Sequence, residues 1–186
     1  MERALQKIFA PIVLLLLIIL TIPFFYIYDY SQQITTTPDN KVVYQLPYPG
    51  ILPDNPLYFL KATRDKIQDF LTRDNLKKAQ LDLLYSDKRL AMSEALEKKG
   101  KTALALSTLS KGEKYFLKIP LLLRQAKEQG TSPSAELIER IKTSNKKHQQ
   151  VIGKLLQDLP QGEQQPILEI LKLTQSIHDQ LQGLQK

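Results

Sequence analysis

The chain has 186 residues and a formal net charge of +7, and it contains no cysteine and no tryptophan. This length allows one ordinary domain together with a membrane anchor. Without cysteine, disulfide scaffolds and thiolate metal sites are excluded. The sequence also lacks a Gly-x-Ser-x-Gly elbow and a glycine-rich phosphate loop, the common signatures of hydrolases and nucleotide-binding proteins. Its basic residues are interspersed with acidic ones and form no aromatic and basic strip, so we expect no nucleic-acid binding.

The N-terminal part has the pattern of a retained membrane anchor. Residues 8–28 carry no charge and are numerous enough to cross a bilayer as a helix. No pair of small residues marks a cleavage site after them, which favours a signal anchor over a cleaved signal peptide. Arg3 and Lys7 precede this segment and Tyr26 lies near its far end, which places the N-terminus inside. The sequence therefore predicts a cytoplasmic tail at 1–7, a single transmembrane helix at 8–28 and an outer domain.

Two segments of different composition follow the anchor. Residues 29–45 are polar and rich in threonine, which predicts a flexible linker. Residues 46–56 are rich in proline, and each proline fixes its own φ and favours extended geometry in the preceding residue. We expect a stiff strap here, at the start of a helical domain that covers residues 46–186.

The strap and the first helical turn contain the most distinctive motif of the chain, which has two interpretations. One is a recognition segment of polyproline type that binds a partner. The other, which we prefer, is a structural strap that packs Tyr48, Ile51 and Leu52 against the first helices. Asp54 or Asn55 is expected to cap a helix that carries Pro56 in its first turn. The candidate residues of the motif are Tyr48, Pro49, Gly50, Ile51, Leu52, Pro53, Asp54, Pro56, Leu57, Tyr58 and Phe59.

The stretch from Pro49 to Lys61, read with the segments that follow it, resembles a known family. These segments are Arg64-Asp65-Lys66, Asp74 to Ala79 and Lys88 to Ala91. Together they are similar to the bacterial DUF5667 proteins, over roughly residues 44–130. The resemblance implies an extracytoplasmic helical domain of the bacterial cell envelope, often behind one membrane helix. The family has no established activity that the resemblance could carry over to this chain.

Beyond the strap the pattern is helical throughout, which predicts an all-α fold. Turn residues divide the region into five expected helices at 56–71, 74–99, 101–129, 133–159 and 163–184. Pro120 is expected to kink or divide the third of them after about Ile119. Short connections at Gly100 and Gly130 favour antiparallel neighbours, so we expect an antiparallel bundle of about five helices.

Apolar stripes on the last three helices alternate four and three residues apart, as in coiled coils. On the third helix the stripe consists of Ala105, Leu109, Gly112, Phe116, Ile119, Leu123 and Ala126. On the fourth it consists of Ile138, Ile141, Asn145, His148, Ile152, Leu155 and Leu159. On the fifth it consists of Ile167, Ile170, Thr174, Ile177, Leu181 and Leu184.

The polar residues of these helices do not form a recognisable catalytic or metal motif. Neither His148 nor His178 follows a Glu by three residues, as a di-iron bundle would require. We interpret His148 and Asn145 as a buried pair that fixes helix register, and His178 as exposed. The carboxylates of the helices, Asp82, Asp87, Glu94 and Glu97 among them, are expected on solvated faces. We therefore expect no catalytic residue, no metal site and no cofactor.

These observations favour a non-enzymatic, membrane-anchored extracytoplasmic domain that serves as an interaction or scaffold module. Its expected partners are the membrane, and an envelope protein or an anionic wall polymer, because a basic surface favours anionic partners. Homo-oligomers remain an alternative, since long apolar stripes pair within a chain or between chains. A ligand-sensing domain with a pocket near Asn145 and His148 is a second function, and an envelope hydrolase that uses helical carboxylates is a third.

Overall fold

The computed structural model describes residues 44–159 and 164–183, and their regular elements are all α-helices. The expected tail at 1–7, the expected membrane segment at 8–28 and residues 29–43 of the expected linker lie outside the described residues. Within the described part, none of the helices combines the length and the hydropathy needed to cross a membrane. The described helices are α2 (Tyr58–Leu71), α3 (Asn75–Glu97), α4 (Thr102–Phe116), α5 (Ile119–Glu128), α6 (Ala135–Asp158) and α7 (Gln165–Gly183).

All five expected helical segments are present, and the third is divided into α4 and α5. The division falls at Leu117 and Lys118, after Phe116 and not after Ile119 as predicted. The position follows from the chemistry of Pro120, which lies in the first turn of α5. In a first turn the missing amide hydrogen of proline removes no helical hydrogen bond. Inside one continuous helix it would remove one, so α4 ends before Pro120 and a new helix begins.

Two glycines reverse the chain between successive helices. Gly100 and Gly130 have φ values of +68° and +80°, a conformation that residues with a Cβ rarely adopt. After Gly100, the amide of Lys101 donates to the carbonyl of Leu96 over 3.0 Å, which closes the end of α3 as in a Schellman motif. These tight reversals make α3 antiparallel to α4, and α5 antiparallel to α6.

Side chains cap the first turns of α3 and α6. Asp74 accepts a hydrogen bond of 2.8 Å from the amide of Lys77, and Ser134 accepts one of 3.1 Å from the amide of Leu137. Each cap satisfies one of the amides that have no partner inside the helix. The two caps therefore fix where α3 and α6 begin.

The predicted cap of the first helix is wrong. The helix α2 begins at Tyr58, and its N-cap residue, Leu57, makes no side-chain cap. The side chain of Asn55 instead accepts a hydrogen bond of 2.9 Å from the amide of Leu57, which leaves Pro56 in a turn ahead of the helix.

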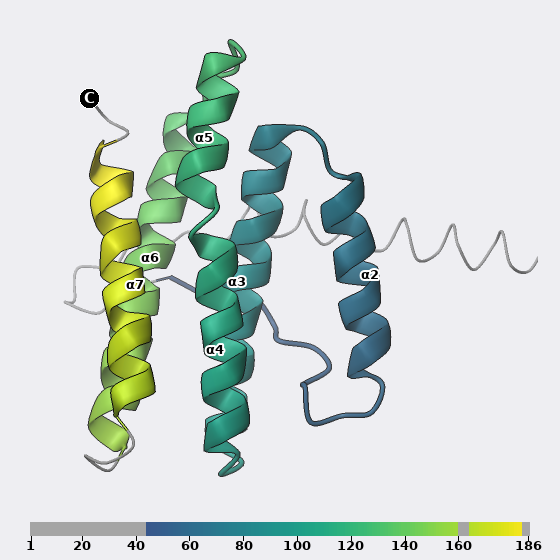
Figure 1. The fold of residues 1–186 in the computed structure, drawn as a ribbon, viewed down its shortest axis with the longest axis vertical. Helices are drawn as coiled ribbons and strands as arrows, with labels where there is room; N and C mark the ends of the chain where they lie inside the picture. Colours follow the sequence, from purple (N-terminus) through teal and green to yellow (C-terminus); the bar gives the residue numbers. More distant parts are fainter. Residues whose placement is uncertain (1–43, 160–163, 184–186) are drawn as a thin grey trace, which may run out of the picture. The chain divides into compact units, whose positions relative to one another are not determined.

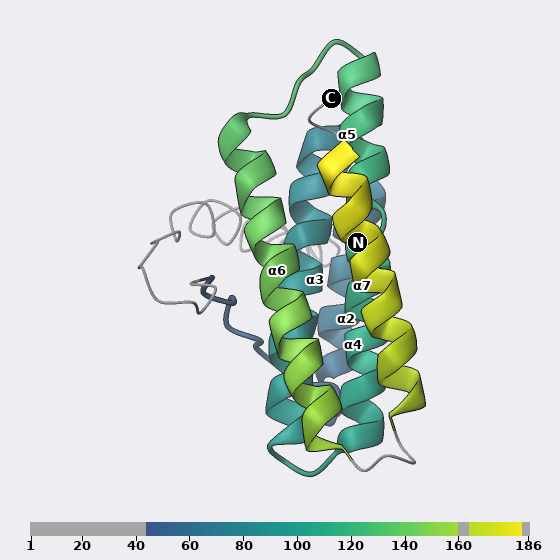
Figure 2. The same ribbon diagram turned by 90° about the vertical axis from the view of Figure 1, so that its left-hand side faces the viewer.

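The hydrophobic core lies between α3, the α4–α5 pair, α6 and α7. Figure 2 shows α6 and α7 side by side, with α3 and α4 behind them. The predicted stripe of the third segment is fully buried, and that of the fourth is buried except for the half-buried Ile138. The stripe of α7 is buried through Leu181, and Leu184 lies outside the described residues. One cluster of this core contains Leu90, Leu109, Val151, Ile152, Leu155, Leu159, Ile167 and Ile170.

The helix α2 lies apart from this core, beside α3. Figure 1 shows it next to α3, on the side away from α6 and α7. Its one buried residue is the acidic Asp65, whereas each of the other helices buries several apolar side chains. The apolar side chains of α2 therefore add little to the core.

Candidate functional site

The predicted motif folds as a turn that is held by Lys61. The ammonium group of Lys61 donates to the carbonyl of Pro49 over 2.7 Å and to that of Ile51 over 3.4 Å. Between these carbonyls, Gly50 has a φ of +68° and lies against the Lys61 ammonium. Burial lowers the pKa of Lys61 to about 8, partly offset by the nearby carboxylate of Asp65. The last residue of the motif stretch therefore fixes the conformation of its first residues.

Asp54 ties the same turn to the α3–α4 connection. Its carboxylate accepts hydrogen bonds of 2.8 Å from Lys101 and 3.1 Å from Lys99. These two lysines hold the pKa of Asp54 below its ordinary value. The strap is thus attached to the bundle mainly through polar groups.

The apolar residues of the motif, in contrast, face solvent. Tyr48 is 78% exposed, and Ile51, Leu57 and Phe59 are also exposed. The expectation that Tyr48 and Ile51 pack against the first helices is therefore wrong, while Leu52 is half-buried as a strap would require. The remaining residues of the motif, Pro49, Gly50, Pro53, Asp54 and Tyr58, are half-buried, and Pro56 is exposed.

The inner side of α2 is polar. The Tyr85 hydroxyl on α3 lies 3.1 Å from the carbonyl oxygen of Asp65 and 3.0 Å from the side-chain oxygen of Gln68. Arg89 donates a hydrogen bond of 3.1 Å to the Tyr58 hydroxyl. Lys78 on α3 lies 3.7 Å from the carboxylate of Asp69. Hydrogen bonds and ion pairs, rather than apolar burial, therefore hold α2 on α3.

The outer face of α2 is apolar. Phe59, Ile67 and Phe70 share one side of the helix because they lie eight and three residues apart, close to two turns and one turn, and Leu60 and Leu71 flank them. All five are exposed, Phe59 by 63% and Phe70 by 78%. An amphipathic helix normally turns its apolar side to the core. Here the two sides are reversed, and the outer face of α2 is left without a described partner.

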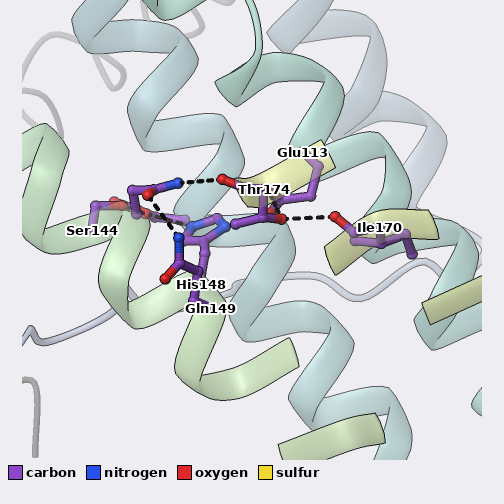
Figure 3. Close-up of polar contacts among 8 residues, drawn as sticks. Glu113, Ser144, His148, Gln149, Ile170 and Thr174 are labelled. Carbon is purple, nitrogen blue, oxygen red and sulfur yellow. Dashed lines mark hydrogen bonds and ion pairs between the residues drawn. The ribbon is translucent and has the colours of Figure 1, made fainter. Parts of the chain in front are cut away.

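A second feature lies inside the bundle, where a polar cluster crosses the apolar core. It is centred on His148 of α6, which is fully buried. One ring nitrogen of His148 lies 2.5 Å from Glu113 of α4, and the other lies 3.0 Å from Asp87 of α3. Figure 3 shows His148 and Ser144 of α6 facing Glu113 of α4 and Thr174 of α7. The members of this polar cluster are Tyr44, Asp87, Glu113, Ser144, Asn145, His148, Thr174 and His178.

The two carboxylates keep His148 protonated. Burial by itself would lower the pKa of His148, but the charge of Glu113 and the hydrogen bonds to Glu113 and Asp87 outweigh burial and raise the pKa to about 9. Burial also raises the pKa of Asp87, against hydrogen bonds from His148 and Ser144 and the charge of Arg140. A doubly protonated ring is the form in which both nitrogens donate to carboxylates.

Asp87 accepts further hydrogen bonds, one of which comes from Tyr44, just ahead of the strap. Ser144 donates to one carboxylate oxygen over 2.6 Å, and the Tyr44 hydroxyl donates to the other over 2.6 Å. Tyr44 is buried although the expected linker 29–45 included it, so that expectation is wrong at this residue. The reason is that its phenol brings a donor to a buried carboxylate, which a polar linker composition does not predict.

The cluster continues to α7 through Asn145. Its side-chain amide donates to the carbonyl of Thr174 over 3.3 Å, and its oxygen lies 3.2 Å from a ring nitrogen of His178. The Thr174 hydroxyl lies 2.8 Å from Glu113. The burial of Asn145 and His148 on the stripe is confirmed, whereas His178, expected to be exposed, is half-buried by its contact with Asn145.

The expectation of solvated carboxylates is wrong for Asp82 and Asp87, which are both fully buried. Neither oxygen of Asp82 has a hydrogen-bond partner within the described residues, and burial raises its pKa to about 7, against the charge of Lys118. Glu94 and Glu97 are half-buried. A signal for Asp87 exists in the sequence, because it lies four residues after Leu83 and three before Leu90, on the buried side of α3.

The fold and these two features define an all-α domain whose helices are joined by a buried polar cluster. Comparison with protein families identifies the class more closely: the model of the domain of unknown function DUF5667 matches residues 50–162, which is more than half of the chain. The chain belongs to the DUF5667 family. No curated protein and no solved structure matches it. The match ends before α7, although α7 supplies Thr174 and a wall of the core.

We predict that Lys61 controls the order of the strap. In Lys61→Met the side chain keeps its length but loses its donors, so amide hydrogen exchange in residues 46–56 should become about tenfold faster, as expected for one lost hydrogen bond. Lys66→Met, an exposed change on the same helix, is the matched control. Equal exchange in the two variants would show that the turn does not depend on Lys61.

We predict that the two histidines differ strongly in their effect on stability. In residues 40–186 at pH 7, His148→Leu leaves two buried carboxylates without their shared donor and should lower the free energy of unfolding by about 3–5 kcal/mol. This loss should shrink toward acid pH, because burial raises the pKa of Asp87 and the unpaired carboxyl then takes up a proton. His178→Leu removes one half-buried contact and should cost less than about 1 kcal/mol. Urea denaturation measures both, and similar losses would contradict the central place of His148.

Proposed function

We propose that this chain is a membrane-anchored, extracytoplasmic helical domain of the bacterial cell envelope that acts by docking and not by catalysis. The docking surface is the outer face of α2. The single observation that carries this proposal is the reversed polarity of α2, which turns polar groups to α3 and large apolar side chains to solvent. Contiguous apolar side chains of this kind mark interaction sites on soluble domains.

The sequence supports the location and the fold supports the docking role. The uncharged segment 8–28, with Arg3 and Lys7 before it, favours an anchor that leaves the domain outside. The core is complete without α2, because the buried stripes of α4 to α7 are packed against α3 and one another. The apolar side chains of α2 therefore contribute little to the fold of the described domain, and a role in binding accounts for their exposure.

The two other functions find less support in the polar residues. Both ring nitrogens of His148 are hydrogen-bonded to carboxylates, so the ring has no free nitrogen with which to bind a ligand. A groove of about 420 Å³ lies between α4 and α7, and its polar lining is Ser107, Ser110, Lys114 and Glu169, outside the polar cluster. For a hydrolase, Asp87 and Glu113 are the only facing carboxylates in the cluster, and their complete burial leaves them no access to substrate.

Single-cysteine labelling tests the docking surface, because the chain has no cysteine of its own. Phe70→Cys places a thiol on the outer face of α2, and Leu121→Cys places one on α5, at a residue that is 51% exposed. The full-length chain is labelled in intact cells with a maleimide that does not cross membranes, and each rate is divided by the rate in urea.

We expect Leu121→Cys to be labelled from outside and Phe70→Cys to be labelled about tenfold more slowly, since an occupied face is protected. Equal normalised rates at both positions would refute the docking surface. Failure to label Leu121→Cys in intact cells, with prompt labelling after the cells are opened, would refute the outer location.

A further inference from the structure

The chemistry of α2 indicates what covers its outer face. Both acidic residues of the helix lie away from its outer face: Asp65 is buried and pairs with Arg64 of the same helix, and Asp69 lies 3.7 Å from Lys78 of α3. The outer face therefore carries no negative charge. Lys66 is exposed one turn before Phe70, at the edge of the apolar face. Phenylalanine, leucine and isoleucine on one side, with lysine at the edge, are the composition of helices that lie in the plane of a membrane surface.

The position of α2 in the chain brings this face to a membrane. The uncharged segment 8–28 is separated from Tyr44, the first described residue, by residues 29–43. A chain segment of that length cannot span more than roughly 50 Å. The strap then leads directly into α2, and Lys61 of α2 holds the turn in the strap. A bilayer that holds the anchor is therefore always within reach of α2, at a high effective concentration.

From these observations we infer that the outer face of α2 binds the surface of the lipid bilayer in which the chain is anchored. This inference rests on the proposed docking function and names its partner. The helix lies along the membrane surface with Phe59, Ile67 and Phe70 among the acyl chains. Lys66 remains at the level of anionic headgroups. The polar contacts between α2 and α3 stay intact, so the bundle is held on the membrane without unfolding.

A protein partner would meet the same apolar face, but it accounts for less of what is seen. The face is a single convex helix with only Thr63 as an additional polar residue along its centre, and it offers no hydrogen-bonding pattern for selectivity. A lipid bilayer requires no such hydrogen-bonding pattern. The exposed lysine at its edge and the absence of acidic residues match an anionic membrane surface, where each basic residue adds attraction.

The absence of tryptophan provides a direct test, because one introduced tryptophan is the only one in the chain. Full-length Phe70→Trp and Leu121→Trp are each reconstituted in vesicles of phosphatidylcholine and phosphatidylglycerol, with and without bromine on the acyl chains. Bromine quenches tryptophan only on contact. Phe59→Trp serves as a second reporter at the other end of the outer face, and circular dichroism confirms that each variant is helical.

We expect brominated lipid to reduce the fluorescence of Phe70→Trp and Phe59→Trp about twofold and to leave Leu121→Trp unchanged. Replacing phosphatidylglycerol by phosphatidylcholine should weaken this quenching. No quenching at Phe70 and Phe59, or equal quenching at Leu121, would overturn the membrane-binding inference. If Phe70→Cys is nevertheless protected in cells, a protein partner or a second copy covers the face, and the proposed docking function stands without the lipid surface.

Discussion

The protonated ring of His148, held between Asp87 and Glu113, is the interaction on which the arrangement of the helices depends. It joins α3, α4 and α6 at one level, and Asn145 and Thr174 extend the connection to α7. Burying three ionisable groups is costly unless each finds its partner, so a shift of any helix by one turn would leave a charge unpaired. Apolar stripes alone would tolerate such a shift. The polar cluster thus selects one register among several that bury similar apolar area.

This constraint explains why α2 is free for another task. The register of the core is set by α3 to α7, and Tyr44, two residues before the strap, is attached to the same cluster through Asp87. With both the core and the strap fixed, α2 needs only polar contacts to α3 to hold its position. Its apolar side chains are then available to a surface outside the domain. The strap and the first turn of α2 contribute to both parts, because Lys61 and Asp54 fix the turn while Tyr48 and Phe59 remain exposed.

The spacing of apolar residues predicted most of the fold. Residues that alternate four and three apart lie on one side of a helix, and that side is the one expected to be buried. The spacing therefore predicted the buried positions of Ile119 and Ile152 correctly. It gave no prediction for Phe70, which is exposed, because an amphipathic pattern does not say which side of a helix meets the protein. Nor does the spacing predict that Asp87 and Glu113 pair with His148 of another helix. Pairing across helices depends on register, which the pattern of a single helix does not contain.

The charge of the buried ring is the claim that a single measurement tests most directly. In residues 40–186 with His178→Gln, one imidazole remains, and its NMR signals can be followed through a pH titration. The account predicts a midpoint near pH 9, above the ordinary 6.5. The stabilisation that the proton provides would then be complete below pH 6.5 and lost as the pH rises through 9. A midpoint at or below 6.5 would mean a neutral ring, and it would contradict the pairing of His148 with two carboxylates.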